Sequence, residues 1–297
     1  MLIGGTAFAG TTDSLNVSDE SATAGEEITQ EMDTAIFTDL VESKEEGNVS
    51  ANQALLNSTA EELLNKEQVT YTNAAQLERL VQMGYSKIKL DGPISITKGT
   101  LNYNNWWGTT KDVYVVCLSG TDTNVENQST SWFTDLLSGF EFDNAYVRNV
   151  KKVILENIPA GSNIIVTGHS LGGMVAQQVA SEGELKYNYN IINTVTFGSP
   201  LINGYKREGE VKRLGDTNDV VPYLSVSTLT HVLWQVFGLN RENGGYGWKV
   251  ITAHCESYNR DDVWGAYDVT GVKYGGKTLS LDLGSTAFYH SPVYVSE

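Results

Sequence analysis

The sequence predicts an α/β protein with a mostly parallel central sheet flanked by helices, and with antiparallel strands at its edge. In the middle of the chain, short β-branched runs alternate with segments whose apolar residues recur at helical spacing. One unit is especially clear: residues 163–180, NIIVTGHSLGGMVAQQVA, read as a buried strand, a glycine-rich turn and an amphipathic helix. Turn-separated strand candidates before and after this region predict the antiparallel edge.

The totals favour one sizeable core and exclude two classes of partner. The chain has 297 residues, 40% of them hydrophobic, and a formal charge of −16. Residues 1–65 hold thirteen acidic residues and one lysine, so most of the charge lies there. No basic stripe is present, which argues against nucleic acid, and no apolar run is long enough to span a membrane.

Composition divides the chain near residue 57. Residues 1–57 are acidic and poor in large apolar side chains, so they predict a disordered tail, or the remnant of a signal or pro-segment. The apolar start with Ala7-Phe8-Ala9 resembles the end of a secretory signal, which predicts a secreted protein; a ragged cytoplasmic N-terminus is the alternative. Residues 58–297 are expected to form one domain.

The elements before the central unit are expected to be helices followed by short strands. Ser58 and Glu61 form a capping box for a short helix, and a second helix is expected from Asn73 to Met83. Turn residues then separate three strand candidates that predict an antiparallel meander, at 87–90, 94–97 and 100–103. A hydrophobic central strand is expected at 112–119, and the chain is expected to return to the core at 132–137, WFTDLL. Asp143 is then expected to cap a helix that ends at 159–161.

After the central unit the sequence predicts two more buried strands and a hairpin. The strands are expected at 191–197 and 211–214, and an apolar stretch covers 229–239. Residues 269–274 and 278–283 are expected to pair across Gly275-Gly276. Cys117 and Cys255 specify no disulfide framework and no metal site; Cys117 is expected as a buried thiol, and a bridge between the two stays open.

Gly168-His169-Ser170-Leu171-Gly172 fits G-x-S-x-G, the turn that lifts a serine nucleophile off a strand end. A serine hydroxyl needs a neighbouring base, an acid that orients the base, and fixed donors for the oxyanion. In folds with this turn the partners follow in the order serine, acid, histidine, which excludes His169. Neither a metal nor a cofactor is required for this chemistry.

The choice of acid and base leaves alternatives. Asp219 in NDVVP, just after a short strand, is the expected acid, and Asp216 is its competitor. His254 is the expected base because WKVITAHCESY ends in a predicted loop that could face a cleft. His231, in an apolar helical segment, and His290, near the terminus, remain open. The oxyanion donors are expected to be the Leu171 N–H and the turn at Gly120-Thr121.

Five linked motifs, GHSLGG, LSGTD followed by SWFTDL, TFGSP, NDVVP and the His254 segment, resemble the fungal-type (class 3) lipases over about residues 112–260. The resemblance implies an α/β-hydrolase fold and hydrolysis of carboxylic esters, often acylglycerols. It also implies a catalytic triad of Ser170, Asp219 and His254, and an oxyanion hole formed by Thr121 and Leu171. By the same resemblance, Trp132 lies at the end of the lid and Asp135 lies behind the oxyanion loop.

The chain departs from the family pattern at three places. Ser119 stands where the family usually has an arginine, FEFDNAY replaces the usual His-x-Gly-Phe after the lid, and the lid region 122–131 is short and polar. The short, polar lid region argues against an apolar lid that opens at a lipid surface, and against long-chain triglycerides as substrates.

The sequence therefore predicts a serine esterase or lipase acting on acylglycerols or related acyl esters, as a monomer with at most transient contact with a lipid interface. A phospholipase, a feruloyl-type esterase or a non-catalytic binding domain on the same fold are the alternatives.

Overall fold

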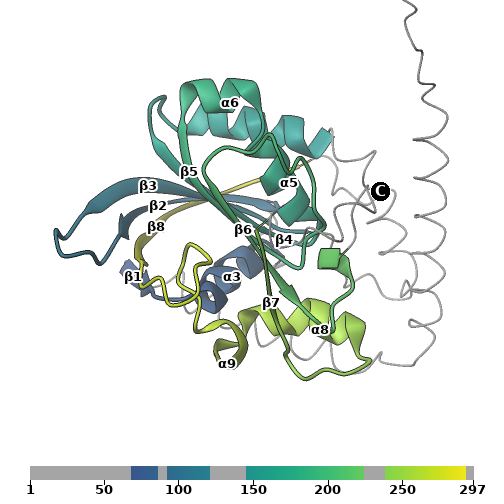
Figure 1. Cartoon of the computed structure of the whole chain (residues 1–297). Coiled ribbons are helices and arrows are strands. Elements are labelled where there is room, and N and C mark those ends of the chain that lie inside the picture. Colours follow the sequence, from purple (N-terminus) through teal and green to yellow (C-terminus); the bar gives the residue numbers. More distant parts are fainter. Residues whose placement is uncertain (1–67, 86–91, 121–144, 224–237, 292–297) are drawn as a thin grey trace, which may run out of the picture.

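A computed structural model describes residues 68–85, 92–120, 145–223 and 238–291 (Figure 1). An eight-stranded mixed sheet forms its centre, in the order β1-β8-β2-β3-β4-β5-β6-β7. The strands from β3 to β7 are mutually parallel, whereas β1, β8 and β2 form an antiparallel edge. The strands are β1 Gln68–Tyr71, β2 Ile94–Asn102, β3 Thr110–Leu118, β4 Asn163–His169, β5 Asn190–Phe197, β6 Glu210–Asp216, β7 Leu239–Glu242 and β8 Thr278–Tyr289.

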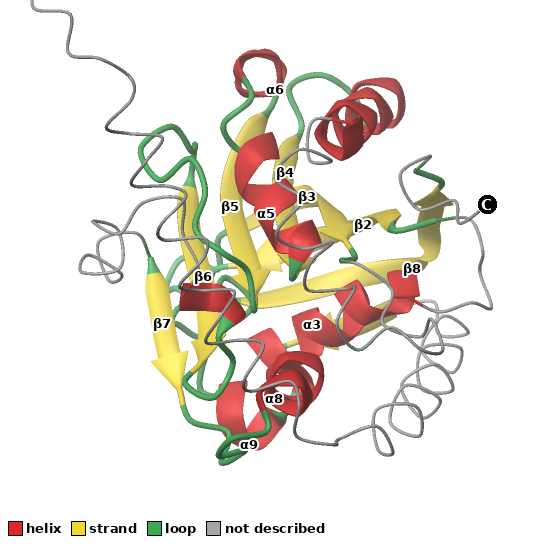
Figure 2. Ribbon diagram, turned by 90° about the vertical axis from the view of Figure 1, so that its right-hand side faces the viewer, coloured by secondary structure: helices red, strands yellow, loops and turns green. Residues whose placement is uncertain are grey.

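Helices cover both faces of the sheet, as the α/β-hydrolase prediction requires (Figure 2). A helical run at 145–157, α5 and α6 lie on one face, and α3, α8 and α9 lie on the other. The labelled helices are α3 Ala74–Gln82, α5 Leu171–Val179, α6 Gly183–Asn188, α8 Val250–Glu256 and α9 Asp261–Trp264, with short 3-10 turns at Met83–Tyr85, Val221–Tyr223 and Ser257–Asn259. None of the helices in the described ranges has the length and apolar character that crossing a bilayer requires.

Local sequence signals explain why α3 forms. The Asn73 side chain accepts a hydrogen bond from the Gln76 N–H at 2.9 Å, which caps the first turn. Leu77, Leu80 and Val81 are buried against the sheet, as their helical spacing predicts. The predicted helix from Asn73 to Met83 is therefore confirmed within a residue at each end.

The meander predicted between residues 94 and 103 is wrong. Residues Ile94–Asn102 form the single strand β2, which pairs with β3 on one side and with β8 on the other. Lys98-Gly99 continues the strand instead of turning, and the pairing with β8 is irregular between Ile96 and Lys98. A Cβ atom on Gly99 would lie 2.6 Å from Leu281 Cδ2, so this glycine permits close approach of two strands.

The hairpin predicted across Gly275-Gly276 is also wrong. β8 pairs with β1 and β2, and residues 269–274 are folded into turns by the buried carboxylate of Asp268. Its Oδ1 accepts hydrogen bonds from the N–H groups of Thr270 and Val272, and its Oδ2 accepts one from the Lys277 N–H. A side chain that satisfies the backbone in this way competes with strand pairing.

Several sequence predictions fall on residues outside the described ranges. These are the acidic tail, the helix at 58–64, the strand at 87–90, the segment 132–137, the cap Asp143 and most of the apolar stretch 229–239. The division at residue 57 therefore stays a prediction. Cys117 is buried in β3, and it is not bonded to Cys255.

Glu78 on α3 is fully buried, and its Oε1 accepts a hydrogen bond from Gln82 Nε2 at 2.5 Å. Burial raises the pKa of this carboxyl well above its ordinary value, so the folded protein keeps this proton to higher pH than the unfolded chain does. An unfolded glutamate releases its proton above a pKa of about 4.3, whereas the folded one does not. The free energy of unfolding should therefore fall by about 1.4 kcal/mol per pH unit from there up to the folded pKa.

We expect Glu78→Gln to remove this pH dependence, because an amide has no proton to lose. Relative to the unsubstituted protein, the variant should gain stability between pH 5 and pH 8 in urea unfolding measurements. Glu156→Gln, on the exposed side of the 145–157 helix, is the control and should show no such gain. Equal slopes for the two variants would contradict the assignment.

Candidate active site

Ser170 lies between the end of β4 and the start of α5, at the edge where the parallel strands finish. Its φ of 54° and ψ of −124° belong to a region that residues with side chains rarely adopt. The Ser170 N–H donates to the Phe197 carbonyl on β5 at 2.9 Å, which fixes the turn to the neighbouring strand. The predicted strand–turn–helix arrangement of G-x-S-x-G is present.

The last glycine of the turn is required by packing. A Cβ atom on Gly172 would lie 2.1 Å from the Leu118 carbonyl oxygen at the end of β3, a contact with backbone that cannot give way. Only a residue without a side chain lets α5 start this close to the sheet. The buried serine is thus held against the ends of its neighbouring strands.

The structure brings Asp219 and His254 into direct contact in the interior. Asp219 follows β6, His254 lies in the last turn of α8, and His254 Nδ1 is 2.8 Å from Asp219 Oδ2. Both side chains are buried, and the second oxygen of Asp219 accepts a hydrogen bond from the Val221 N–H at 2.9 Å. His254 therefore stands on a helix, and the loop predicted for it is wrong.

Gly198 connects this pair with the serine turn. It follows Phe197, whose carbonyl accepts the Ser170 N–H, and a Cβ atom on Gly198 would lie 3.0 Å from Asp219 Oδ2 and 3.1 Å from His254 Cε1. The three residues proposed for catalysis thus gather around one short piece of β5. Their catalytic roles remain predictions.

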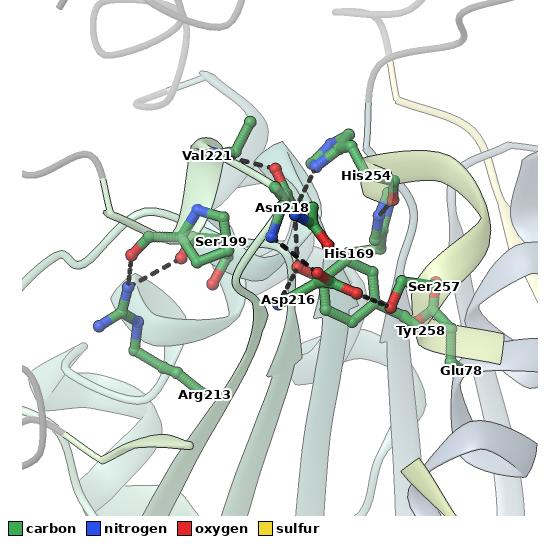
Figure 3. A network of polar contacts seen from close by, with 12 residues as sticks. Glu78, His169, Ser199, Arg213, Asp216, Asn218, Val221, His254, Ser257 and Tyr258 are labelled. Carbon is green, nitrogen blue, oxygen red and sulfur yellow. Dashed lines mark hydrogen bonds and ion pairs between the residues drawn. The ribbon is translucent and has the colours of Figure 1, made fainter. Parts of the chain in front are cut away.

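Tyr258 is a residue that the sequence reasoning missed. Its hydroxyl donates to Asp219 Oδ2 at 2.6 Å, the same oxygen that faces His254, and accepts the Asp216 N–H at 3.0 Å. Its ring stacks on Trp264 with centroids 5.6 Å apart, and Figure 3 shows it within the polar network that holds His254. The signal in the sequence was the spacing of four from His254, which places two side chains on one side of a helical stretch.

Asp216, the competing acid, is used by the surrounding loops. Its Oδ1 accepts the Asn218 N–H at 2.8 Å, and its Oδ2 accepts the Gly244 N–H at 2.9 Å and the Ser257 hydroxyl. These contacts join the loop after β6 to residues near α8 (Figure 3). Asp216 therefore shapes the loop that carries Asp219.

His169 supports the backbone of His254. Its Nε2 lies 2.9 Å from the His254 carbonyl oxygen, and the two rings have centroids 4.7 Å apart. Because a carbonyl oxygen only accepts, Nε2 must carry the hydrogen. Burial lowers the pKa of His169 well below its ordinary value, and the neighbouring His254 lowers it further, so His169 is neutral at physiological pH.

Arg213 on β6 is a second residue that the sequence reasoning missed. Its buried Nη2 donates to the carbonyls of Ser199 at 2.9 Å and Pro222 at 2.5 Å, which joins the end of β5 to the loop after Asp219 (Figure 3). Burial lowers the pKa of the guanidinium to about 9, so it still carries its charge at neutral pH.

The remaining candidates are split between described and undescribed parts of the chain. Leu171 begins α5 and is buried, as an oxyanion donor beside the serine should be. His290 is exposed just past β8, where its carbonyl accepts a hydrogen bond from Asn149 Nδ2 at 2.9 Å. Thr121, Trp132, Asp135 and His231 lie outside the described residues. Within the described ranges, no three His, Cys, Asp or Glu side chains are grouped to hold a metal ion.

Comparison with known proteins gives one family and one solved structure. Residues 94–228 match the family model of the class 3 lipases, which confirms the resemblance for the stretch that contains Ser170 and Asp219. The chain is also similar to the crystal structure of M37 lipase, at 16% identity over 44% of this chain and 55% of that one, with a TM-score of 0.27. The chain thus spans about half the length of that protein. No curated protein matches the chain.

We expect Tyr258→Phe to reduce ester hydrolysis by about 10- to 100-fold, the range for a lost hydrogen bond to a buried charge. The substitution also leaves the Asp216 N–H without the hydroxyl it now uses, so the melting temperature should fall. Tyr189→Phe is a matched control, because it removes a buried hydroxyl that bonds only to backbone carbonyls of the 145–158 segment. If both variants lose activity equally, the effect is general destabilisation and not positioning of Asp219.

Proposed function

We propose that this chain, whose residues 94–228 match the class 3 lipases, is a serine carboxylic-ester hydrolase that works through an acyl-enzyme. The observation that carries the proposal is the buried contact of 2.8 Å between Asp219 and His254, next to the strained turn at Ser170. An imidazole ring held by a buried carboxylate is the arrangement that activates a serine hydroxyl.

In the proposed reaction Ser170 Oγ attacks the ester carbonyl carbon while His254 takes the hydroxyl proton. Asp219, bonded to Nδ1, orients the ring so that Nε2 serves as the base, and it stabilises the imidazolium that forms. His254 then returns the proton to the leaving alcohol. In the second half it activates a water molecule that attacks the acyl-enzyme and releases the acid.

The oxyanion of the tetrahedral intermediate needs fixed donors. The N–H of Leu171 is at the N-terminus of α5, next to the serine, and Thr121 follows the end of β3 in the sequence. The resemblance to the class 3 lipases implies the N–H groups of Leu171 and Thr121 as these donors. We assign them the role of oxyanion hole, and removal of one such donor typically reduces kcat by about 10²- to 10³-fold.

For the substrate we propose acylglycerols or related acyl esters. The polar lid region 122–131 favours esters of short or medium acyl chains over long-chain triglycerides. Relative kcat/KM values of the wild-type protein over a chain-length series of p-nitrophenyl esters, with phosphatidylcholine and a feruloyl ester alongside, separate these classes.

We expect Ser170→Ala to lower p-nitrophenyl ester hydrolysis by at least about 10³-fold while the melting temperature stays within a few degrees, because the nucleophile is lost and little packing is. Labelling by a fluorophosphonate probe should disappear with it, since only an activated serine reacts. Ser181→Ala, just past the other end of α5, should hydrolyse and label normally. Persistent labelling of Ser170→Ala would place the nucleophile elsewhere.

We expect His254→Ala to reduce kcat by about 10²- to 10⁴-fold, the range for a lost general base. His290→Ala, which removes an exposed imidazole just past β8, should leave kcat unchanged. Steady-state kinetics on the two variants decide between His254, the expected base, and His290, one of its two alternatives. The reverse result would move the base to His290.

A further inference from the structure

The face of the sheet that carries α5 and α6 changes character halfway along its antiparallel strands. On β2, Ile94 and Ile96 are buried under the helices, whereas Lys98 and Thr100, which point to the same side, are not. β3 repeats this pattern. Among the described residues, this second half of the face is polar and reaches solvent.

An open groove of about 620 Å³ lies over this polar half. The register places Thr100 between Asp112 on β3 and Ser280 on β8, and Lys98 between Tyr114 and Asp282. The Thr100 hydroxyl donates to Asp112 Oδ1 at 3.2 Å. The groove therefore combines hydroxyl groups, carboxylates and one ammonium group on a floor of paired strands, with the amides of Gln68 and Asn163 at its sides.

Two tryptophans stand at the end of the same hairpin. Trp106 and Trp107 are 94% and 84% exposed at the tip between β2 and β3, which projects from the body in Figure 1. The tip begins two residue pairs beyond Thr100 and Asp112, about 7 Å along the ladder.

The tip is held in place by its own hydrogen bonds. Asn105 Oδ1 accepts the Thr109 N–H at 3.0 Å, Asn105 Nδ2 donates to the Thr109 hydroxyl at 3.0 Å, and Asn104 Nδ2 donates to the Gly276 carbonyl. The aromatic rings are thus presented by an ordered turn, which lowers the entropy lost when a partner binds them.

The chemistry of the groove selects among partners. Its lining carries two carboxylates and one ammonium group, which disfavours phosphate, nucleic acid and anionic lipid head groups. Its lining is mixed, with Val113, Tyr114 and Leu281 beside the charged and hydroxyl side chains, and an acyl chain would leave those polar groups without partners. A sugar fits both parts, because its hydroxyls donate and accept hydrogen bonds and its apolar ring face stacks on an aromatic side chain.

We propose that this groove, together with Trp106 and Trp107, binds a neutral oligosaccharide. The groove begins near the middle of β3, at Tyr114, and extends away from the strand end next to Ser170; four residues of strand, about 13 Å, separate Tyr114 from Leu118 at that end. Glycan binding there would leave the ester-hydrolysing edge free and would hold the protein on a polysaccharide. The inference does not depend on the proposed function.

Isothermal titration of the full chain with cellohexaose, xylohexaose and chitohexaose tests the proposal. We expect saturable binding of at least one hexasaccharide, and at least tenfold weaker binding for the double variant Trp106→Ala/Trp107→Ala and for Asp112→Ala. Tyr187→Ala, which removes an 89% exposed ring from α6, is the matched control and should bind normally. All variants should hydrolyse a soluble p-nitrophenyl ester at the wild-type rate.

The same variants define the results that would overturn the proposal. Absence of binding to all three sugars, or binding that the tryptophan and Asp112 variants leave unchanged, rules out this groove. Sedimentation with phosphatidylcholine or phosphatidylglycerol vesicles that is lost in the tryptophan variant would make the hairpin a lipid contact instead. Because both tryptophans are exposed, their removal should not unfold the protein, and an unchanged melting temperature checks this.

Discussion

One buried carboxylate oxygen holds the candidate site together. Oδ2 of Asp219 faces both the His254 ring nitrogen and the Tyr258 hydroxyl, and Oδ1 accepts a backbone N–H. A buried carboxylate is stable only if such donors replace the water it has lost. Two donors come from the helical stretch 250–259 and the third from the loop after β6, so the same requirement that stabilises the charge also fixes how α8 meets that loop.

Around this oxygen, other buried polar side chains connect neighbouring segments of the backbone by hydrogen bonds. Asp216 ties the loop after β6 to residues near α8, Arg213 joins that loop to the end of β5, and His169 binds the carbonyl of His254. Each of them satisfies a backbone group that would otherwise be buried without a partner. The geometry of the reactive side chains is therefore set by residues that need not touch a substrate.

The antiparallel edge of the sheet is organised differently from the parallel part. β4 and β5 end beside Ser170 and are buried along nearly their whole length, whereas β2 and β3 run from a buried half to a polar half. Loops carrying a hydrolase site are expected at the carboxyl ends of parallel strands. The antiparallel edge has one solvent-exposed face, which offers a second binding surface separate from the strand ends beside Ser170.

The sequence by itself determined the features that depend on neighbours along the chain. The buried strands, the turn at Ser170 and the capped helix α3 follow from periodicity, glycine placement and capping residues, all of which are local. The continuous strand β2 and the partnership of β8 with β1 and β2 depended on strand pairing across about 180 to 210 residues, whereas the Asp268 turn is local and its carboxylate was not recognised in the sequence. The tertiary structure also decided that Asp219 and not Asp216 meets His254, and that Tyr258 joins them. Such contacts are selected by which buried charges can be satisfied together, and that condition exists only once the chain is folded.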